Sequence, residues 1–400
     1  MGATGANFIE SVPSGRPVNN RRPSGRASAN GDSRARKKAL LEAKLPANRI
    51  VKVIAAFALA IAFGFAAAPN ASSETKLPFP RPASIEPNVD FWVNVFTKYS
   101  DHDFIIVDRD NVSRVYRVFH LPGDGQPTRT DIDWANNYLK IKYGDILSRL
   151  ATGREPANYE EREVAAMFKG ETPSAYAAAA QNLRVQEGLR ERFHDGLLRS
   201  RYYIPTMERI FRSAGLPPEL VTLAHVESGF HGASRSSAGA VGIWQFTRDT
   251  GKHYMKITRY HDDRLNPERE TLAAATLLRS NYETLGDWPL AITAYNYGTG
   301  GVARAAEIYG GDYSQMVQHY QGPHFGFAVK NYYAEFLAAL QVHRYEDKYF
   351  PGIADEPAIR PAPIKADFAP PKRSKKSHAS RTHQASSKTH HSKKTVAQNT

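Results

Sequence analysis

The stretch Ala224-His225-Val226-Glu227-Ser228-Gly229-Phe230 places a single carboxylate among apolar and aromatic residues. Upstream, Pro217-Pro218 suits the start of a helix, because the amide that proline lacks would be unsatisfied there. Glu227 then falls at helical spacing from the apolar positions 220, 223 and 224, which predicts that it points to their side. The apolar setting and the negative end of the helix dipole both disfavour a charged carboxylate and should raise its pKa. Glu227 is therefore a candidate general acid for a glycosidic bond.

Two further blocks follow this stretch, namely Gly239-Ala240-Val241-Gly242-Ile243-Trp244-Gln245-Phe246 and Ala294-Tyr295-Asn296-Tyr297-Gly298. In order and spacing, the three blocks resemble the catalytic domain of the soluble lytic transglycosylase (SLT) family, and within it the membrane-bound lytic murein transglycosylase D type. Glu-Ser-Gly alone occurs by chance in many chains, so the resemblance depends on all three blocks. It runs from Phe79-Pro80-Arg81-Pro82 and Val89-Asp90-Phe91-Trp92, through Gln186-Glu187-Gly188, to Gly326-Phe327-Ala328-Val329-Lys330-Asn331-Tyr332-Tyr333-Ala334-Glu335 and the alanine-rich residues after it.

The resemblance implies a mainly α, lysozyme-like α+β fold, with an SLT catalytic domain over residues 201–348 and a mixed, largely helical accessory region over 87–200. It also implies cleavage of the β-1,4 bond between N-acetylmuramic acid and N-acetylglucosamine in peptidoglycan glycan strands. Glu227 would act first as acid and then as base, the muramoyl 6-hydroxyl would close on C1, and the product would carry a 1,6-anhydro end. No cofactor and no metal are expected.

The resemblance also implies roles for six other residues in substrate binding. Ser236 would contact the acetamido group or the region of Glu227, Gln245 would bind polar groups of the sugar, and Asn296 would hold the loop or the substrate. Tyr295 would hydrogen-bond near Glu227. Trp244 and Tyr297 would stack on sugars, with core packing as the alternative for both and for Tyr295. Position 297 tends to be histidine in relatives, so a proton role is not carried over.

Other residues are predicted to serve packing or local structure. His225 is adjacent to Glu227 but points to another face, and Phe325 and Phe327 are predicted core residues. Asp262 and Asp263 lack further ligands at metal spacing, which favours a turn and a helix cap.

The distribution of acidic residues favours a mechanism with one carboxylate. Glycoside hydrolysis normally uses two carboxylates, but residues 228–248 contain no Asp or Glu. The next acids, Asp249, Asp262, Asp263 and Glu268, lie on a polar segment that is predicted to be surface. Two alternatives remain open: a muramidase that admits water to the same site, and a non-catalytic peptidoglycan-binding scaffold with this fold.

Positive charge is concentrated at the two ends of the chain. The whole chain carries +13, and residues 1–52 and 371–400 carry +8 each, so residues 53–370 are net −3. The folded part therefore gives no reason to expect nucleic-acid binding. The tail could attract an anionic wall or membrane surface, and its histidines at 378, 383, 390 and 391 fit a solvated tail better than a metal site.

The N-terminal region has the features of an export signal. An apolar run of 16 residues, 53–68, is short for a membrane span of about 20, which favours a signal peptide over an anchor within 49–71. Residues 1–48 are predicted to be disordered, and translation from Val51 would exclude them from the protein. A periplasmic or cell-envelope location is expected. The absence of cysteine excludes disulfides and a lipidated cysteine anchor.

Pattern and composition also predict the other segments. Residues 72–86 read as a proline-rich linker, and 349–400 as a disordered tail that is first proline-rich and then basic. Strands are expected at Phe104–Val107 and Val115–Phe119. Helices are expected at 88–99, 132–151, 159–168, 173–213, 268–285, 288–297 with Gly298 as the C-cap, 301–309 and 326–346.

Overall fold

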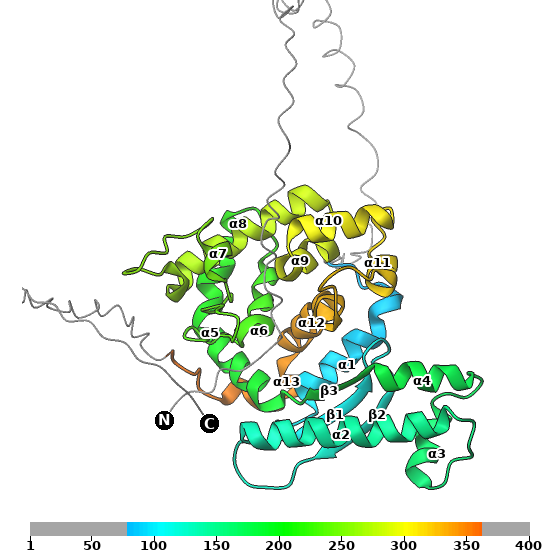
Figure 1. Ribbon diagram of the computed structural model, residues 1–400. Helices are drawn as coiled ribbons and strands as arrows, with labels where there is room; N and C mark the ends of the chain where they lie inside the picture. Colours follow the sequence, from blue (N-terminus) through cyan, green and yellow to red (C-terminus); the bar gives the residue numbers. More distant parts are fainter. Residues whose placement is uncertain (1–77, 362–400) are drawn as a thin grey trace, which may run out of the picture.

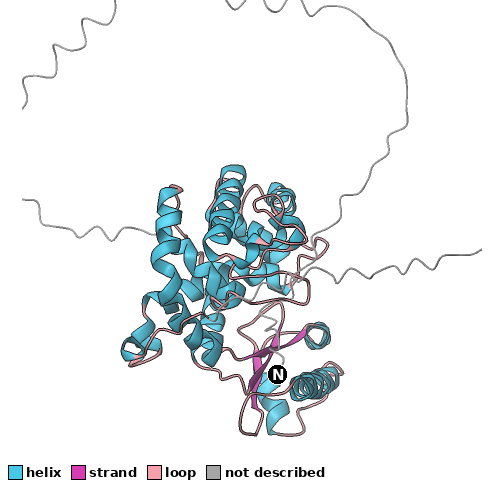
Figure 2. Ribbon diagram, turned by 90° about the vertical axis from the view of Figure 1, so that its left-hand side faces the viewer, coloured by secondary structure: helices cyan, strands magenta, loops and turns pink. Residues whose placement is uncertain are grey.

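The computed structural model describes residues 78–361, and this part of the chain is mainly helical with one small sheet, as predicted (Figure 2). The helices, with 3₁₀ helices marked η, are η1 Ala83–Ile85, α1 Glu86–Thr97, α2 Arg129–Leu150, α3 Tyr159–Ala166, α4 Pro173–Gln181, α5 Arg190–Ser213, η2 Pro218–Thr222, α6 Leu223–Ser228, α7 Arg248–Gly251, η3 Asp263–Leu265, α8 Pro267–Leu285, α9 Trp288–Tyr297, α10 Thr299–Ile308, α11 Tyr313–His319, α12 Phe327–Arg344, α13 Glu346–Tyr349 and η4 Ile353–Asp355. The strands are β1 Asp103–Asp108, β2 Val115–His120 and β3 Leu183–Glu187.

Helix α12 lies at the centre of the larger, helical unit, where it packs against α1, α6 and α9 (Figure 1). Ten consecutive residues of α12, 331–340, are buried, which explains why this segment is apolar on nearly every side. The one amide among them, Asn331, accepts hydrogen bonds from Asn88 at 2.8 Å and from the indole of Trp92 at 3.2 Å. These two bonds tie α1 to α12 across 239 or more residues of sequence.

The sheet has the order β2-β1-β3 and is antiparallel throughout. Side chains of β1 alternate between its two faces. Ile105 and Val107 join the large helical core, while Phe104 and Ile106 join a second core with Leu139 of α2. The sheet with α2, α3 and α4 thus forms a smaller unit whose sheet shares one face with the larger unit (Figure 1).

Two local predictions require correction, and three α-helices were not predicted. The segment 173–213 is not one helical stretch, because β3 separates α4 from α5 and pairs with β1 over five residue pairs. Residues 217–228 form η2 followed by α6 instead of one helix. The three helices without a predicted counterpart are α7, α11 and α13. The remaining predicted helices and strands are present with ends shifted by a few residues, and α9 ends at Gly298 as expected.

The predicted segment boundaries also shift. The division between residues 200 and 201 falls inside α5, and α1 packs on α12 of the larger unit although it was placed in the accessory region. Phe79, in the predicted linker, packs edge-on against Trp288 and Phe336. Phe350 and Ile353, in the predicted tail, are buried in the same core. Apolar side chains anchor both ends of the described segment, which composition alone did not reveal.

The predictions for residues 1–77 and 362–400, including the apolar run at 53–68 and the basic tail, lie outside the described residues. Within residues 78–361, no helix is both long enough and apolar enough to span a membrane.

Candidate functional site

Glu227 lies in the last turn of α6, where the chain reverses sharply. Gly229 ends the helix at φ 57°, and its amide donates to the carbonyls of Ala224 and His225. The next residue, Phe230, is also left-handed at φ 59° and is fully buried. The loop that follows returns over α6, where the hydroxyl of Ser228 donates to the carbonyl of Ile243 at 2.8 Å. The turn therefore places the second sequence block beside the helix of the first.

The carboxyl group of Glu227 is enclosed by protein but keeps part of its side chain accessible to solvent. Tyr332 of α12 donates a hydrogen bond from its hydroxyl to Glu227 Oε1. Burial raises the pKa of Glu227 to about 7, and the Tyr332 hydrogen bond opposes part of this rise because it favours the carboxylate. A carboxyl with this pKa is present in both protonation states near neutral pH, which is what an acid that later serves as a base requires.

A second buried carboxylate, Glu270 of α8, fixes the loop beside Glu227. Its Oε2 accepts the amide of Ile243 at 2.8 Å and its Oε1 accepts the amide of Trp244 at 3.0 Å. Gly242, at φ 92°, lies directly over this carboxylate, and an added Cβ would stand 2.4 and 2.5 Å from its oxygens. The backbone therefore approaches the Glu270 carboxylate closely at Gly242, where only glycine leaves room.

Gln245 adopts φ 51°, an uncommon conformation for a residue other than glycine. Its side-chain amide donates to the carbonyl of Gly242 at 2.8 Å. Such strain costs on the order of 1–3 kcal/mol and persists only where neighbouring contacts enforce it, often at functional sites. The structure thus places Gln245 on the loop that Glu270 anchors, partly accessible to solvent.

Ser236 closes a tight turn on the same loop. Its amide donates to the carbonyl of Ala240, and its Oγ accepts the amide of Ala240, both at 3.0 Å. The hydroxyl is used within the loop, and the structure gives it no contact with Glu227.

The third block brings Tyr295 close to Glu227 but not into a hydrogen bond with it. The Tyr295 hydroxyl donates to the carbonyl of Trp244 at 2.9 Å. Burial and then the negative charge of Glu227 raise the pKa of Tyr295 well above its usual range. The expected tyrosine partner of Glu227 is instead Tyr332, and Tyr295 supports the loop that carries Gln245.

Asn296 and Tyr297 differ in how their polar atoms are used. The Asn296 side-chain oxygen is buried and has no hydrogen-bond partner, so it remains able to accept a donor. The Tyr297 hydroxyl donates to the carbonyl of Pro323 at 2.7 Å, and its ring meets Phe325 edge-on. Tyr297 is partly exposed.

Trp244 is a core residue. Its side chain has 0% exposure, its ring stacks on Phe211, and its indole donates to Thr271 at 3.0 Å. The expectation that it stacks on sugar is therefore corrected, because no ring face is accessible. Phe325, Phe327 and His225 are also buried, as predicted from their settings.

Sequence reasoning missed Tyr332, Glu270 and Glu335. All three lie on helices whose other residues are mostly apolar or small, so helical spacing already placed them toward the core. Glu335, one turn after Tyr332, is 2% exposed, and its Oε1 has no hydrogen-bond partner. Burial raises the pKa of both Glu270 and Glu335 well above the usual range. The buried acids near Glu227 thus lie on the buried faces of α8 and α12. Of the four acids that were predicted to lie on the surface, Asp263 is buried, with 4% exposure.

Asp262 caps η3 as predicted, accepting the amide of Arg264 at 3.2 Å, and it also accepts the guanidinium of Arg264 at 2.9 Å. Among residues 78–361 there is no group of three or more His, Cys, Asp or Glu side chains placed to hold a metal ion. In chemical terms, the site combines a proton donor of near-neutral pKa with a rigid loop.

Comparison with known proteins identifies part of the chain. Residues 208–315 match the family model described as "Transglycosylase SLT domain". The chain is 40% identical over 114 residues to "Membrane-bound lytic murein transglycosylase D" of Escherichia coli K12, which is 28% of this chain and 25% of that protein. It is 27% identical over 165 residues to "Putative tributyltin chloride resistance protein" of Alteromonas sp., or 41% of this chain and 77% of that protein.

A solved structure, an inactive mutant of the lytic transglycosylase Slt from Pseudomonas aeruginosa, is 17% identical with a TM-score of 0.29 and covers 37% of this chain and 25% of that one. The chain thus matches about a quarter of the length of the E. coli relative.

Proposed function

We propose that this chain, whose residues 208–315 form a transglycosylase SLT domain, is a lytic transglycosylase that cleaves the β-1,4 bond between N-acetylmuramic acid and N-acetylglucosamine in peptidoglycan. One observation carries the proposal. Glu227 lies inside the matched segment, is held by Tyr332, and has a pKa of about 7. A proton donor with these properties is what cleavage of a glycosidic bond near neutral pH requires.

In the proposed reaction, Glu227 gives its proton to the glycosidic oxygen as the bond to C1 breaks, while the substrate's 2-acetamido group assists at C1. Glu227, now a carboxylate, accepts the proton of the muramoyl 6-hydroxyl, whose oxygen bonds to C1. The product is a 1,6-anhydro end, and no water is consumed. Because the nucleophile belongs to the substrate, it benefits from an effective molarity that replaces a base-activated water.

The surroundings of the other buried acids support a mechanism with one carboxylate. Both oxygens of Glu270 accept backbone amides, and the residue is 1% exposed. Glu335 is 2% exposed. Neither side chain presents a carboxylate to a solvent-filled face, where an attacking water would have to be activated.

The alternatives are a muramidase that admits water to the same site and a scaffold that binds peptidoglycan without cleaving it. Digestion of purified sacculi followed by mass analysis of the muropeptides separates all three. The proposal expects products about 18 Da lighter than hydrolysed ones, by loss of one water. Hydrolysed ends would establish the muramidase, and unchanged sacculi would establish the scaffold. Glu227→Gln provides the control, because an amide keeps the shape of the side chain and cannot deliver a proton.

We place the protein in the cell envelope, facing peptidoglycan glycan strands. The apolar run at 53–68 and the similarity to the E. coli relative, whose name describes it as membrane-bound, support this location. We also propose that the basic tail, residues 372–400, attracts an anionic wall or membrane surface through its eight cationic residues.

Removal of residues 372–400 tests the tail separately from the active site. Turnover of short soluble glycans should be unchanged, while pelleting with sacculi should weaken at low salt. The difference should shrink as salt rises, because exposed charges are screened beyond about 8 Å at physiological ionic strength. Equal pelleting of both forms at every salt concentration would reject the role of the tail.

A further inference from the structure

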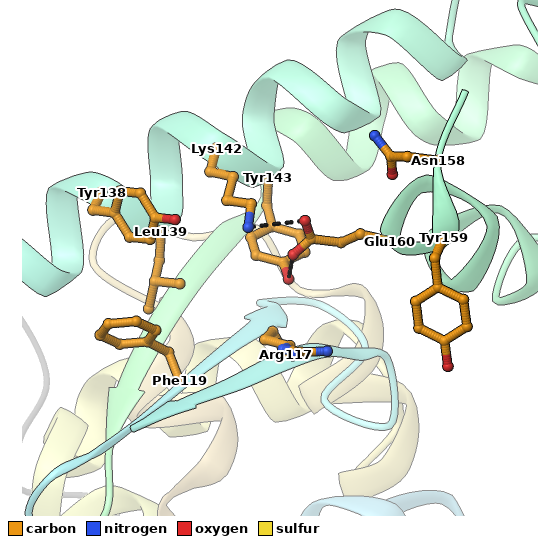
Figure 3. Close-up of a pocket in the computed structure, with 9 residues that line it drawn as sticks. All are labelled: Arg117, Phe119, Tyr138, Leu139, Lys142, Tyr143, Asn158, Tyr159 and Glu160. Atoms are coloured by element: carbon orange, nitrogen blue, oxygen red, sulfur yellow. Dashed lines mark hydrogen bonds and ion pairs between the residues drawn. The ribbon is translucent and has the colours of Figure 1, made fainter. Parts of the chain in front are cut away.

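A surface pocket of about 500 Å³ lies in the smaller unit, between α2, the edge strand β2 and the start of α3 (Figure 3). Its lining residues are Arg117, Phe119, Tyr138, Leu139, Lys142, Tyr143, Asn158, Tyr159 and Glu160. None of them belongs to the SLT domain or contacts Glu227. The volume falls within the range of about 300–1,000 Å³ that is typical of small-molecule sites.

An exposed aromatic platform adjoins this pocket. The rings of Trp134 and Tyr138, one turn apart on α2, lie parallel at 3° with centroids 5.2 Å apart. Phe119 of β2 packs against both rings, at 6.0 and 5.8 Å. Trp134 is nevertheless 52% exposed and Tyr138 is 39% exposed. Aromatic side chains held rigidly in contact with solvent commonly mark a binding surface.

The charged groups of the pocket are all paired with groups of opposite charge, within the pocket or beside it. Lys142 pairs with Glu160 at 2.8 Å, as the dashed line in Figure 3 shows, and Arg117 pairs with Glu163 at 3.7 Å. Tyr143 donates its hydroxyl to the same Glu160 at 2.5 Å. The aromatic platform together with the exposed Tyr159 at the rim therefore suits an uncharged ligand with apolar faces and polar edges, while the side chain of Asn158 caps α3 through Glu161.

We propose that this pocket and its aromatic platform form a second glycan-binding site, which takes an uncharged, N-acetylated sugar segment. Pyranose rings have apolar C–H faces that stack on aromatic rings, and their hydroxyl and acetamido groups meet the polar rim. The inference rests on the proposed function, since the glycan strand is then both the substrate at Glu227 and the ligand at this site. The smaller unit would hold the strand while the SLT domain cleaves it.

Tryptophan fluorescence offers a direct test. The chain has four tryptophans, and the other three, Trp92, Trp244 and Trp288, are at most 6% exposed. Chitotetraose, an uncharged β-1,4-linked N-acetylglucosamine oligomer, is titrated into the full chain carrying Glu227→Gln. A saturable change in Trp134 emission is expected. Adding Tyr138→Ala keeps the reporter and should weaken binding by about 2- to 13-fold, the usual contribution of one aromatic contact.

Tyr202→Ala is the matched control, because Tyr202 is 59% exposed on a helix of the other unit, α5. It should leave the titration unchanged. Absence of any emission change, or equal affinity with and without Tyr138→Ala, would overturn the proposal. Binding of a free stem peptide in place of the sugar would also overturn it.

Activity measured separately distinguishes this inference from the proposed function. Tyr138→Ala in the otherwise unaltered chain should retain turnover of short soluble glycans and lose part of the rate on intact sacculi. If no anhydro product forms but chitotetraose still changes Trp134 emission, the proposed function fails and the binding site stands.

Discussion

At the scale of single residues, the proposed chemistry depends on the environment of one carboxyl group, that of Glu227. The pKa of Glu227 is raised by burial to about 7 from 4.5, so the folded protein binds a proton there that the unfolded chain releases. This group therefore contributes its full stability below about pH 4.5, and that contribution is lost as the pH rises through about 7. The acid that the proposed reaction needs is thus a source of instability at alkaline pH.

Glu227→Gln should stabilise the protein at alkaline pH relative to acidic pH. The amide cannot ionise, so the free energy of unfolding of the variant, relative to that of the unaltered protein, should increase between pH 4.5 and pH 8. The increase should be at most about 3 kcal/mol, and it should be smaller than this because the side chain is partly accessible to solvent. Denaturant unfolding at the two pH values measures this difference. Glu307→Gln, on the exposed surface of α10, controls for the loss of one negative charge. The same advantage at both pH values would show that Glu227 has an ordinary pKa.

Tyr332→Phe should shift the pH dependence of activity. Because the tyrosine hydrogen bond lowers the pKa of Glu227, its removal should raise that pKa. Activity of the unaltered enzyme should fall above about pH 7 as the acid loses its proton. In the variant, the alkaline decline should move to higher pH, and the rate should drop because Glu227 is less well oriented. Tyr295→Phe is the comparison, since its hydroxyl binds Trp244 instead. An unmoved alkaline limb in the Tyr332 variant would contradict this role.

At the scale of elements, the loop of residues 239–246 is shaped by contacts from outside it. Glu270 holds two of its amides, Tyr295 holds one of its carbonyls, and Gly242 leaves room for the carboxylate. The loop can then keep Gln245 in a left-handed conformation beside α6.

Gly242→Ala should disrupt this loop, whereas Gly239→Ala should cost only backbone strain. Both glycines have positive φ, at 92° and 79°. A Cβ at Gly239 meets nothing within 4 Å, while one at Gly242 would collide with Glu270 and with the carbonyl of Arg264 at 2.3 Å. In the Gly239 variant, the strain of a left-handed alanine should lower the free energy of unfolding by about 1–2 kcal/mol. In the Gly242 variant, the free energy of unfolding should fall by more than this, and activity should be lost as well. Thermal unfolding and turnover measure both. Equal losses in the two variants would mean that the contact with Glu270 does not matter.

The sequence predicted most elements but few of the contacts between them. Helix α9 could be located because Pro289 stands near its start and Gly298 at its end, both of which are local signals. Strand β3 was not predicted because it lies between two helices and is defined by its pairing with β1, 75 or more positions away. Glu227 was recognisable from its own neighbours. Tyr332 and Glu270 were not, because only folding brings α12 against α6 and Glu270 against the loop beside Glu227.

At the scale of the whole molecule, the described chain is built as two cores that share a sheet. The SLT domain at 208–315 ends before α12, which supplies Tyr332 and the centre of the larger core. Phe79 and α1 cover α12, and Phe350 and Ile353 complete the same core. The larger unit therefore needs residues from both ends of the described segment.

A segment of residues 201–348 alone should fail to fold cooperatively, while residues 78–361 should fold. The shorter segment loses Phe79, α1, half of α5, Phe350 and Ile353 from its core, and each such buried side chain contributes about 1.5–3 kcal/mol. Circular dichroism melting of the two segments tests this expectation. A sharp transition and turnover in the shorter segment would show that α1 is dispensable.

The hydrogen bond between Tyr332 and Glu227 joins residues 105 positions apart. Until α12 has docked, Glu227 is not enclosed, so its pKa should be that of an ordinary glutamate and it is ionised at neutral pH. A chain that is still being synthesised or translocated therefore carries its glutamate in the form that cannot donate a proton. In the proposed mechanism, the proton donor therefore forms only once α12, the last long helix within residues 78–361, has docked.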